Sequence, residues 1–140
     1  MHTPIKKHPL GMVFGVFDGF HEGHRYFLRE AKEYCEKLVV VVAHPNIVLT
    51  LKQRVPLRSL SERMQAVRDF DATLEVTSGD TAIGTWSALK RYQPSLVLLG
   101  YDQKHLGEEL TKIGMVHQFI AAHHPEKYKS SLLNAKKIEV

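Results

Sequence analysis

The sequence predicts a doubly wound, Rossmann-like α/β domain built on a five-stranded parallel sheet. Apolar runs alternate along the chain with segments whose apolar residues recur at helical spacing, which is the pattern of such folds. Two of the runs, 38–43 and 96–99, are apolar without interruption, as strands covered on both faces are. Because the chain has 140 residues and no evident repeat or linker, we expect a single domain over residues 1–140.

The individual elements follow from local signals. We expect strands at 12–17, 38–43, 72–76, 96–99 and 116–120. Helices should cover 22–36, a stretch opened by the capping box of Ser59 and Glu62, a stretch capped by Asp80 or Thr81, 106–113 up to Gly114, and a last stretch from Ser130 or Ser131 through Ile138. Residues 44–58 are expected to form a loop. The buried helix faces should include Cys35 in the first helix and Ile83, Trp86 and Leu89 in the third.

Bulk composition narrows the class of partner. The formal net charge is +4, and the basic residues are spread along the chain rather than gathered in a tract with interleaved aromatics. No nucleic-acid partner is therefore expected, whereas an anionic small molecule fits. No apolar run is long enough to span a bilayer and no leader peptide is recognisable, so we expect no membrane partner. The single cysteine can form no internal disulfide, which agrees with a cytoplasmic location.

The segment from Gly15 to His24 carries the strongest chemical signal. It places His21 and His24 three residues apart where the first strand turns into the first helix. A helix N-terminus offers unpaired N–H donors to an anion, and Gly23 lets a phosphate approach the backbone. Two surface histidines, or a metal site without a third ligand nearby, are the alternatives. Neither a P-loop nor a dinucleotide-binding glycine motif is present.

The same segment resembles the Gly-x-Phe-Asp…His-x-Gly-His signature of the cytidylyltransferase-like nucleotidyltransferases. Three further segments resemble that family in the same order: 59–67 with its Glu62-Arg63 pair, 99–103, and 129–131. The last segment departs from the family pattern, because Leu132 stands where many relatives have threonine and Ala135, followed by Lys136, where arginine is usual.

The resemblance implies transfer of a nucleoside monophosphate from a nucleoside triphosphate to a phosphomonoester, with release of pyrophosphate. Such an acceptor is already an anionic nucleophile, so no general base is needed and none is evident. Residues 99–103 are especially like archaeal-type FAD synthases, so the first expectation is FMN adenylyltransferase using ATP. A glycerol-3-phosphate cytidylyltransferase using CTP is the alternative, and a non-catalytic nucleotide-binding module is an alternative of another class.

The resemblance also assigns residues. The expected catalytic residues, which contact the reacting phosphates, are His21, His24, Lys52 and Ser130. The expected binding residues are Val16, Phe17, Asp18, Gly23, Arg63, Gly100, Asp102, Tyr128 and Ser131. Phosphate contacts by Arg54, Lys127, Lys129 and Lys136 are left open. Mg²⁺ is expected on the triphosphate, held mostly by phosphates and water, and a homodimer is expected.

Overall fold

The computed structural model describes residues 7–121, and the structural statements below concern that part of the chain. Its elements, in chain order, are β1 (His8–Gly15), α1 (Glu22–Lys32), β2 (Cys35–Val42), α2 (Pro45–Lys52), α3 (Leu60–Phe70), β3 (Glu75–Ser78), α4 (Ser87–Tyr92), β4 (Leu96–Leu99), α5 (Lys104–Lys112) and β5 (His117–Phe119). The helix expected from Ser130 or Ser131 lies outside the described residues.

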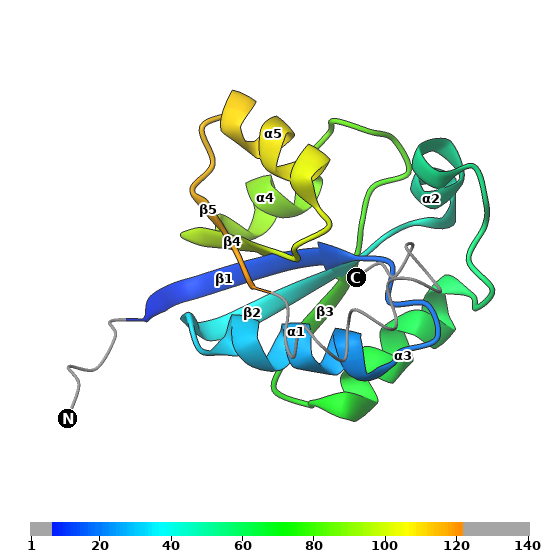
Figure 1. The fold of residues 1–140 in the computed structure, drawn as a ribbon, viewed down its shortest axis with the longest axis horizontal. Helices are drawn as coiled ribbons and strands as arrows, with labels where there is room; N and C mark the ends of the chain where they lie inside the picture. The colour runs from blue at the N-terminus through cyan, green and yellow to red at the C-terminus, as the bar shows by residue number, and fades with distance from the viewer. Residues whose placement is uncertain (1–6, 122–140) are drawn as a thin grey trace.

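The strands form one parallel sheet in the order β3-β2-β1-β4-β5, with β1 at its centre. Figure 1 shows α1 and α3 against one face, α4 and α5 against the other, and α2 near the end toward which the strands point. The predicted doubly wound, Rossmann-like fold with five parallel strands is confirmed. None of the described helices is long and apolar enough to cross a membrane.

Successive residues of the central strands point to opposite faces of the sheet and contribute to two separate hydrophobic cores. On the face of α1 and α3, Val13, Val40 and Leu98 pack with Phe27 and Leu28 of α1. On the opposite face, the neighbouring strand residues pack with α4 and α5. That second cluster consists of Met12, Val39, Val41, Leu89, Val97, Leu99 and Leu110. Because both faces are covered, the strands read as continuous apolar runs in the sequence.

The segment 44–58 is not entirely a loop, as the sequence had suggested, because it contains α2. His44 caps this helix by accepting a hydrogen bond at Nδ1 from the backbone N–H of Asn46, at 3.1 Å. Pro45 stands in the first turn, where its missing N–H costs nothing. The only buried residue of α2 is Val48. A helix with one buried side chain has no apolar stripe by which the sequence could reveal it.

Other boundaries also differ from expectation. The third expected helix does not begin at residue 80 or 81 but as α4 at Ser87, and Asp80 reaches it by accepting from the Ser87 backbone N–H at 2.9 Å. Ile83 was wrongly placed in the core, since it is 58% exposed. The first helix ends at Lys32, so Cys35 opens β2 instead; its thiol is buried there, which raises its pKa. The third strand lies at 75–78 rather than 72–76.

Candidate active site

The carboxyl ends of β1, β2 and β4 meet at one edge of the sheet because these strands are parallel neighbours. The segments 16–18, 43–44 and 100–102 follow them directly. The connections run in opposite directions on the two sides of β1, which makes this edge a topological switch point. Doubly wound folds bind their ligands at such points.

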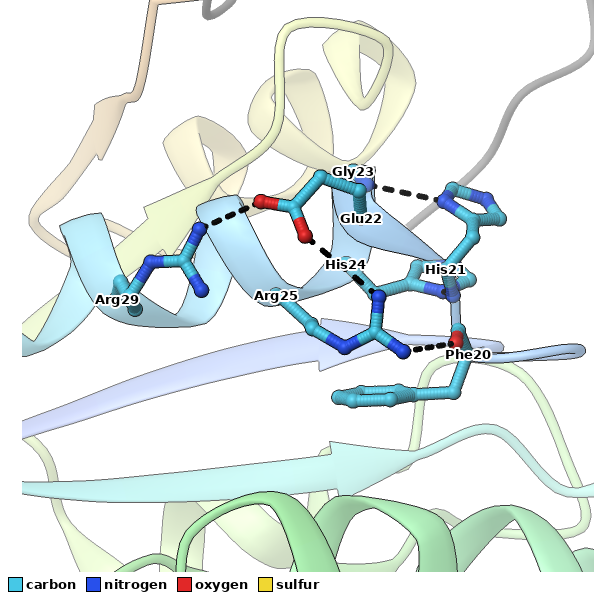
Figure 2. Close-up of polar contacts among 7 residues, drawn as sticks. All are labelled: Phe20, His21, Glu22, Gly23, His24, Arg25 and Arg29. Carbon is cyan, nitrogen blue, oxygen red and sulfur yellow. Dashed lines mark hydrogen bonds and ion pairs between the residues drawn. The ribbon is translucent and has the colours of Figure 1, made fainter.

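His21 and His24 cap the N-terminus of α1 reciprocally. His21 Nδ1 accepts a hydrogen bond from the Gly23 backbone N–H at 3.1 Å, and His24 Nδ1 accepts one from the His21 backbone N–H at 3.0 Å. Figure 2 shows the His21 ring turned back toward Gly23, with its other nitrogen directed away from the helix. The spacing that the sequence offered as a phosphate motif is therefore also a capping motif.

These caps fix which ring nitrogen carries the proton. A nitrogen that accepts a backbone N–H must present its lone pair, so a neutral ring at either position bears its hydrogen on Nε2. Each Nε2–H of His21 and His24 is thus a defined hydrogen-bond donor. A phosphate oxygen is an acceptor without protons of its own at neutral pH, so the tautomer suits a phosphate.

The two imidazoles differ in exposure. Their rings stack with centroids 3.8 Å apart. His24 is only 1% exposed and lies between Phe17 and Phe20, with ring centroids 5.4 and 5.7 Å away. His21 is exposed. Of the two rings, His21 is the one open to solvent, and the buried His24 ring packs against it.

Two arginines and one glutamate surround the α1 cap. Partial desolvation of the His21 ring, and secondarily the positive charge of Arg25, lowers the pKa of His21, which favours its neutral form. Glu22 forms ion pairs with Arg25 at 3.6 Å and with Arg29 at 2.6 Å (Figure 2). These exposed pairs contribute little to stability, but they offset the one acidic group in the first turn of α1.

Arg63, on α3, is buried behind this edge and binds backbone carbonyls of three loops. Its Nη1 donates to the carbonyls of Val16 at 3.0 Å and Ala43 at 2.9 Å, and its Nε donates to that of Arg58 at 3.0 Å. The residue is 1% exposed, and Nη2 has no hydrogen-bond partner among the described residues. Burial lowers the pKa of the guanidinium, opposed by the charge of Asp18. The sequence predicted that Arg63 contacts the ligand. In the structure its hydrogen bonds go to the backbone of three loops.

Asp18 makes a second tie between the same loops. Its carboxylate accepts the backbone N–H of Leu57 at 2.7 Å and that of Arg58 at 3.0 Å. The preceding residue, Phe17, has φ = 54°, a strained value for an aromatic residue, and its side chain is fully buried. Strain of about 1–3 kcal/mol persists only where the surroundings enforce it. Here Arg63 holds the carbonyl before Phe17, and Asp18 anchors the residue after it.

The side chain of Gln103 connects β1 and β4 at the switch point. The sequence did not identify it as a site residue. Its Nε2 donates to the Phe14 carbonyl at 2.8 Å, and its Oε1 accepts the Gly100 backbone N–H at 2.9 Å. The side chain thus joins the ends of β1 and β4. The available signal was an amide side chain three residues after the strand-ending Gly100, but nothing in the sequence specified its partner on β1.

The structure brings together only part of the predicted set. Lys52 lies at the last residue of α2, not in a loop, and is partly exposed, while Arg54 and Asp102 are exposed. The Gly23 amide already donates to His21. The predictions for Tyr128, Ser130 and Ser131, and those for Lys127, Lys129 and Lys136, fall outside the described residues. Within residues 7–121, no group of three or more His, Cys, Asp or Glu side chains could hold a metal ion.

A family model described as cytidylyltransferase-like matches residues 12–136. The chain belongs to the cytidylyltransferase-like family. It is accordingly a nucleotidyltransferase, and the resemblance inferred from the His21–His24 signature is confirmed.

Several curated relatives in this family are FAD synthases from archaea. The protein of Thermococcus sibiricus is 36% identical over 128 residues, which cover 89% of this chain and 85% of the relative. That of Thermococcus kodakarensis is 36% identical over 131 residues, covering 91% and 87%. That of Methanosarcina acetivorans is 35% identical over 109 residues, covering 74% and 70%.

Solved structures support the fold. The lipopolysaccharide core biosynthesis protein from Thermoplasma volcanium aligns with a TM-score of 0.70 at 25% identity, covering 83% of this chain and 98% of that one. The pantoate-beta-alanine ligase from Francisella tularensis aligns with a TM-score of 0.51 at 16% identity, covering 83% and 60%. The second likeness shows the fold alone.

Proposed function

We propose that this nucleotidyltransferase is an FMN adenylyltransferase, which makes FAD and pyrophosphate from ATP and FMN. The observation that carries the proposal is the reciprocal cap of His21 and His24, because it leaves both rings as Nε2–H donors at a helix N-terminus and keeps the His21 ring exposed there. The choice of ATP and FMN draws on the relatives of this family that are FAD synthases.

The proposed reaction needs positioning more than acid–base chemistry. A phosphate oxygen of FMN attacks the α-phosphorus of ATP and forms the new P–O bond. The bond from that phosphorus to the oxygen bridging to the β-phosphate breaks, and its electron pair leaves with pyrophosphate. Because the nucleophile is already anionic, the protein must chiefly align the reactants and stabilise charge that develops on the phosphates.

Some of these residues would contact the phosphates, and others would hold the contacting groups and loops in position. We propose that His21 donates from Nε2 to the triphosphate, together with the positive end of the α1 dipole. His24 would hold the His21 ring in place through the stacking of the two rings. Arg63 and Asp18 would act as positioning residues, since their polar atoms bind loop backbone.

The other sequence-derived assignments remain proposals. Lys52 and Asp102 would contact phosphate or nucleoside, and Ser130 and Ser131 would bind the β- and γ-phosphates. Mg²⁺ would come in as part of the ATP complex, because carboxylate and histidine groups of the kind that hold a metal are not clustered within residues 7–121. Its charge would offset that of the leaving pyrophosphate. A single domain over 1–140, a homodimer and a cytoplasmic location likewise stay predictions.

A product screen tests the proposal directly. The purified protein is incubated with ATP or CTP and with FMN, glycerol 3-phosphate or another small phosphomonoester, and products are read by mass spectrometry and pyrophosphate release. FAD formed from ATP and FMN supports the proposal. Product only from CTP and glycerol 3-phosphate would replace it with the cytidylyltransferase alternative, and no product from any pair would favour a non-catalytic nucleotide-binding module.

A further inference from the structure

The chain exposes four large apolar side chains within nine residues, from Leu49 to Leu57. Leu49 is 50% exposed and Leu51 54%, both on α2, and the following loop exposes Val55 to 58% and Leu57 to 94%. Leu57 is the most exposed large hydrophobic residue in the described part of the chain. Single exposed leucines are ordinary, but four large apolar side chains exposed in one short segment are a reason to look for a ligand that covers them.

Polar contacts hold the backbone at the end of this segment, although its apolar side chains are exposed. Asp18 accepts the N–H groups of Leu57 and Arg58, and the buried Arg63 donates to the Arg58 carbonyl. A loop held only by its packing would bury Leu57. Here hydrogen bonds from Asp18, in the loop between β1 and α1, and from Arg63 on α3 set its position instead. The apolar side chain of Leu57 therefore faces solvent from a backbone that is held in place.

The position and charge of the segment narrow what it can receive. Asp18 stands only three residues before His21, so the tie places Leu57 beside the loop that carries the phosphate-binding pair. The basic residues Lys52, Arg54 and Arg58 alternate along the chain with the exposed apolar ones. A surface that is both apolar and basic complements a ligand with an apolar ring system and a phosphate. A small polar acceptor such as glycerol 3-phosphate would leave the apolar residues unused.

We propose that the segment 49–58 is the acceptor platform, a surface on which the aromatic ring system of the phosphomonoester acceptor lies while its phosphate faces His21. The inference rests on the proposed function and deepens it, because it assigns to these residues the choice of a ring-bearing acceptor over a small one. Leu57 and Val55 are specificity-determining residues in this account, and Asp18 is the positioning residue that sets the platform beside the histidines.

The test compares apolar-to-polar substitutions on and off the platform. Leu57→Ser and Val55→Ser are assayed with ATP and FMN, and Val116→Ser is the matched control, since Val116 is 59% exposed in the segment before β5. We expect KM for FMN to rise about tenfold in the two platform variants, which corresponds to about 1.4 kcal/mol, with KM for ATP and the melting temperature unchanged. FMN titrated alone and followed by its fluorescence should show the same loss of affinity.

Three outcomes would overturn the inference. An unchanged KM for FMN in Leu57→Ser, while the wild-type protein forms FAD, contradicts the platform and leaves the proposed function standing. A smaller mass of Leu57→Ser in sedimentation, with FMN affinity intact, would show instead that a second copy of the chain covers these residues. A wild-type protein that neither binds FMN nor forms FAD removes the proposed function, and the platform with it.

Discussion

The loops at the sheet edge are built differently in the two halves of the chain. In the first half, α1, α2 and α3 each begin with a side chain that caps them: His21, His44 and Ser59. In the second half, the N-cap residues of α4 and α5, Trp86 and Gln103, make no capping hydrogen bond with their side chains. Arg63 binds carbonyls in three separate loops of the first half, whereas Asp80 accepts from Thr85 in its own loop and from Ser87 at the start of the next helix.

This difference separates a preorganised region from one with fewer constraints. Charge that develops on phosphates is best stabilised by donors that are already in place. The first half has that character, because the histidine donors and the loops beside them are fixed by bonds within the protein. Within residues 7–121, the second half has fewer such hydrogen bonds between separate loops, so we expect its loops to adjust more when a nucleoside binds. Four predictions test this contrast.

The largest effect is expected at Arg63. Arg63→Met removes the guanidinium and leaves the carbonyls of Val16, Ala43 and Arg58 without their donor. Breaking such a buried charged network should lower the free energy of unfolding by about 3–5 kcal/mol. Urea unfolding measures it, with the exposed Arg91→Met as control, for which about 0.5 kcal/mol or less is expected. Equal urea midpoints for Arg63→Met and Arg91→Met would contradict a stabilising role of the Arg63 hydrogen bonds.

Asp18→Asn should have the next largest effect. Asn keeps the shape of the side chain but can accept only one of the two N–H groups of Leu57 and Arg58, because an NH₂ group replaces one oxygen and the charge is lost. We expect a loss of about 1–2 kcal/mol and faster hydrogen exchange of these two amides. Asp69→Asn on α3, where the carboxylate binds only the exposed Gln65, is the control. Unaltered exchange at residues 57 and 58 would contradict the assigned role of Asp18.

Gln103→Ala probes the second half. It removes the bridge between the Phe14 carbonyl and the Gly100 amide, and we expect a loss of about 1 kcal/mol. Kinetically, the change should raise KM for ATP more than it lowers kcat, because the bridge positions a binding loop rather than the histidines. A loss of stability as large as that of Arg63→Met would erase the contrast between the two halves.

The smallest effect is the pH dependence of the His21 cap. Because the pKa of His21 is lowered in the folded protein, the unfolded chain binds the proton more readily between that lowered pKa and 6.5. The contribution of His21 to stability is thus complete above pH 6.5 and declines as the pH falls through this window. His21→Ser keeps a capping oxygen and does not titrate. The melting temperature of His21→Ser should fall less than that of the wild type between pH 7 and 5.5. An equal fall in both proteins would contradict the lowered pKa of His21.

The sequence was sufficient for the parts of the molecule that rest on periodicity. Uninterrupted apolar runs revealed the parallel strands, and the His21–His24 spacing identified a helix N-terminus at the switch-point edge of the sheet. Periodicity could not reveal α2, which buries one residue, nor the exposure of Ile83 in a loop tied by Asp80.

The hydrogen bonds between loops that are distant in sequence could not be predicted, for a different reason. An arginine on a helix looks the same in sequence whether it contacts a phosphate or three backbone carbonyls, and only the packing of α3 behind the edge distinguishes the two. The Arg63 and Gln103 ties join residues 47 and 89 positions apart. No local pattern encodes such pairs.

The most direct test of the account is the rate of FAD formation by His21→Ser. This variant retains an N-cap but has no Nε2–H to donate to the triphosphate, so its fold, checked by circular dichroism, should persist. We expect kcat for FAD formation from ATP and FMN to fall at least about 100-fold, as for the loss of one preorganised donor to a charged transition state. A folded His21→Ser that forms FAD at a near-normal rate would contradict the central claim that this capped histidine pair carries the transfer.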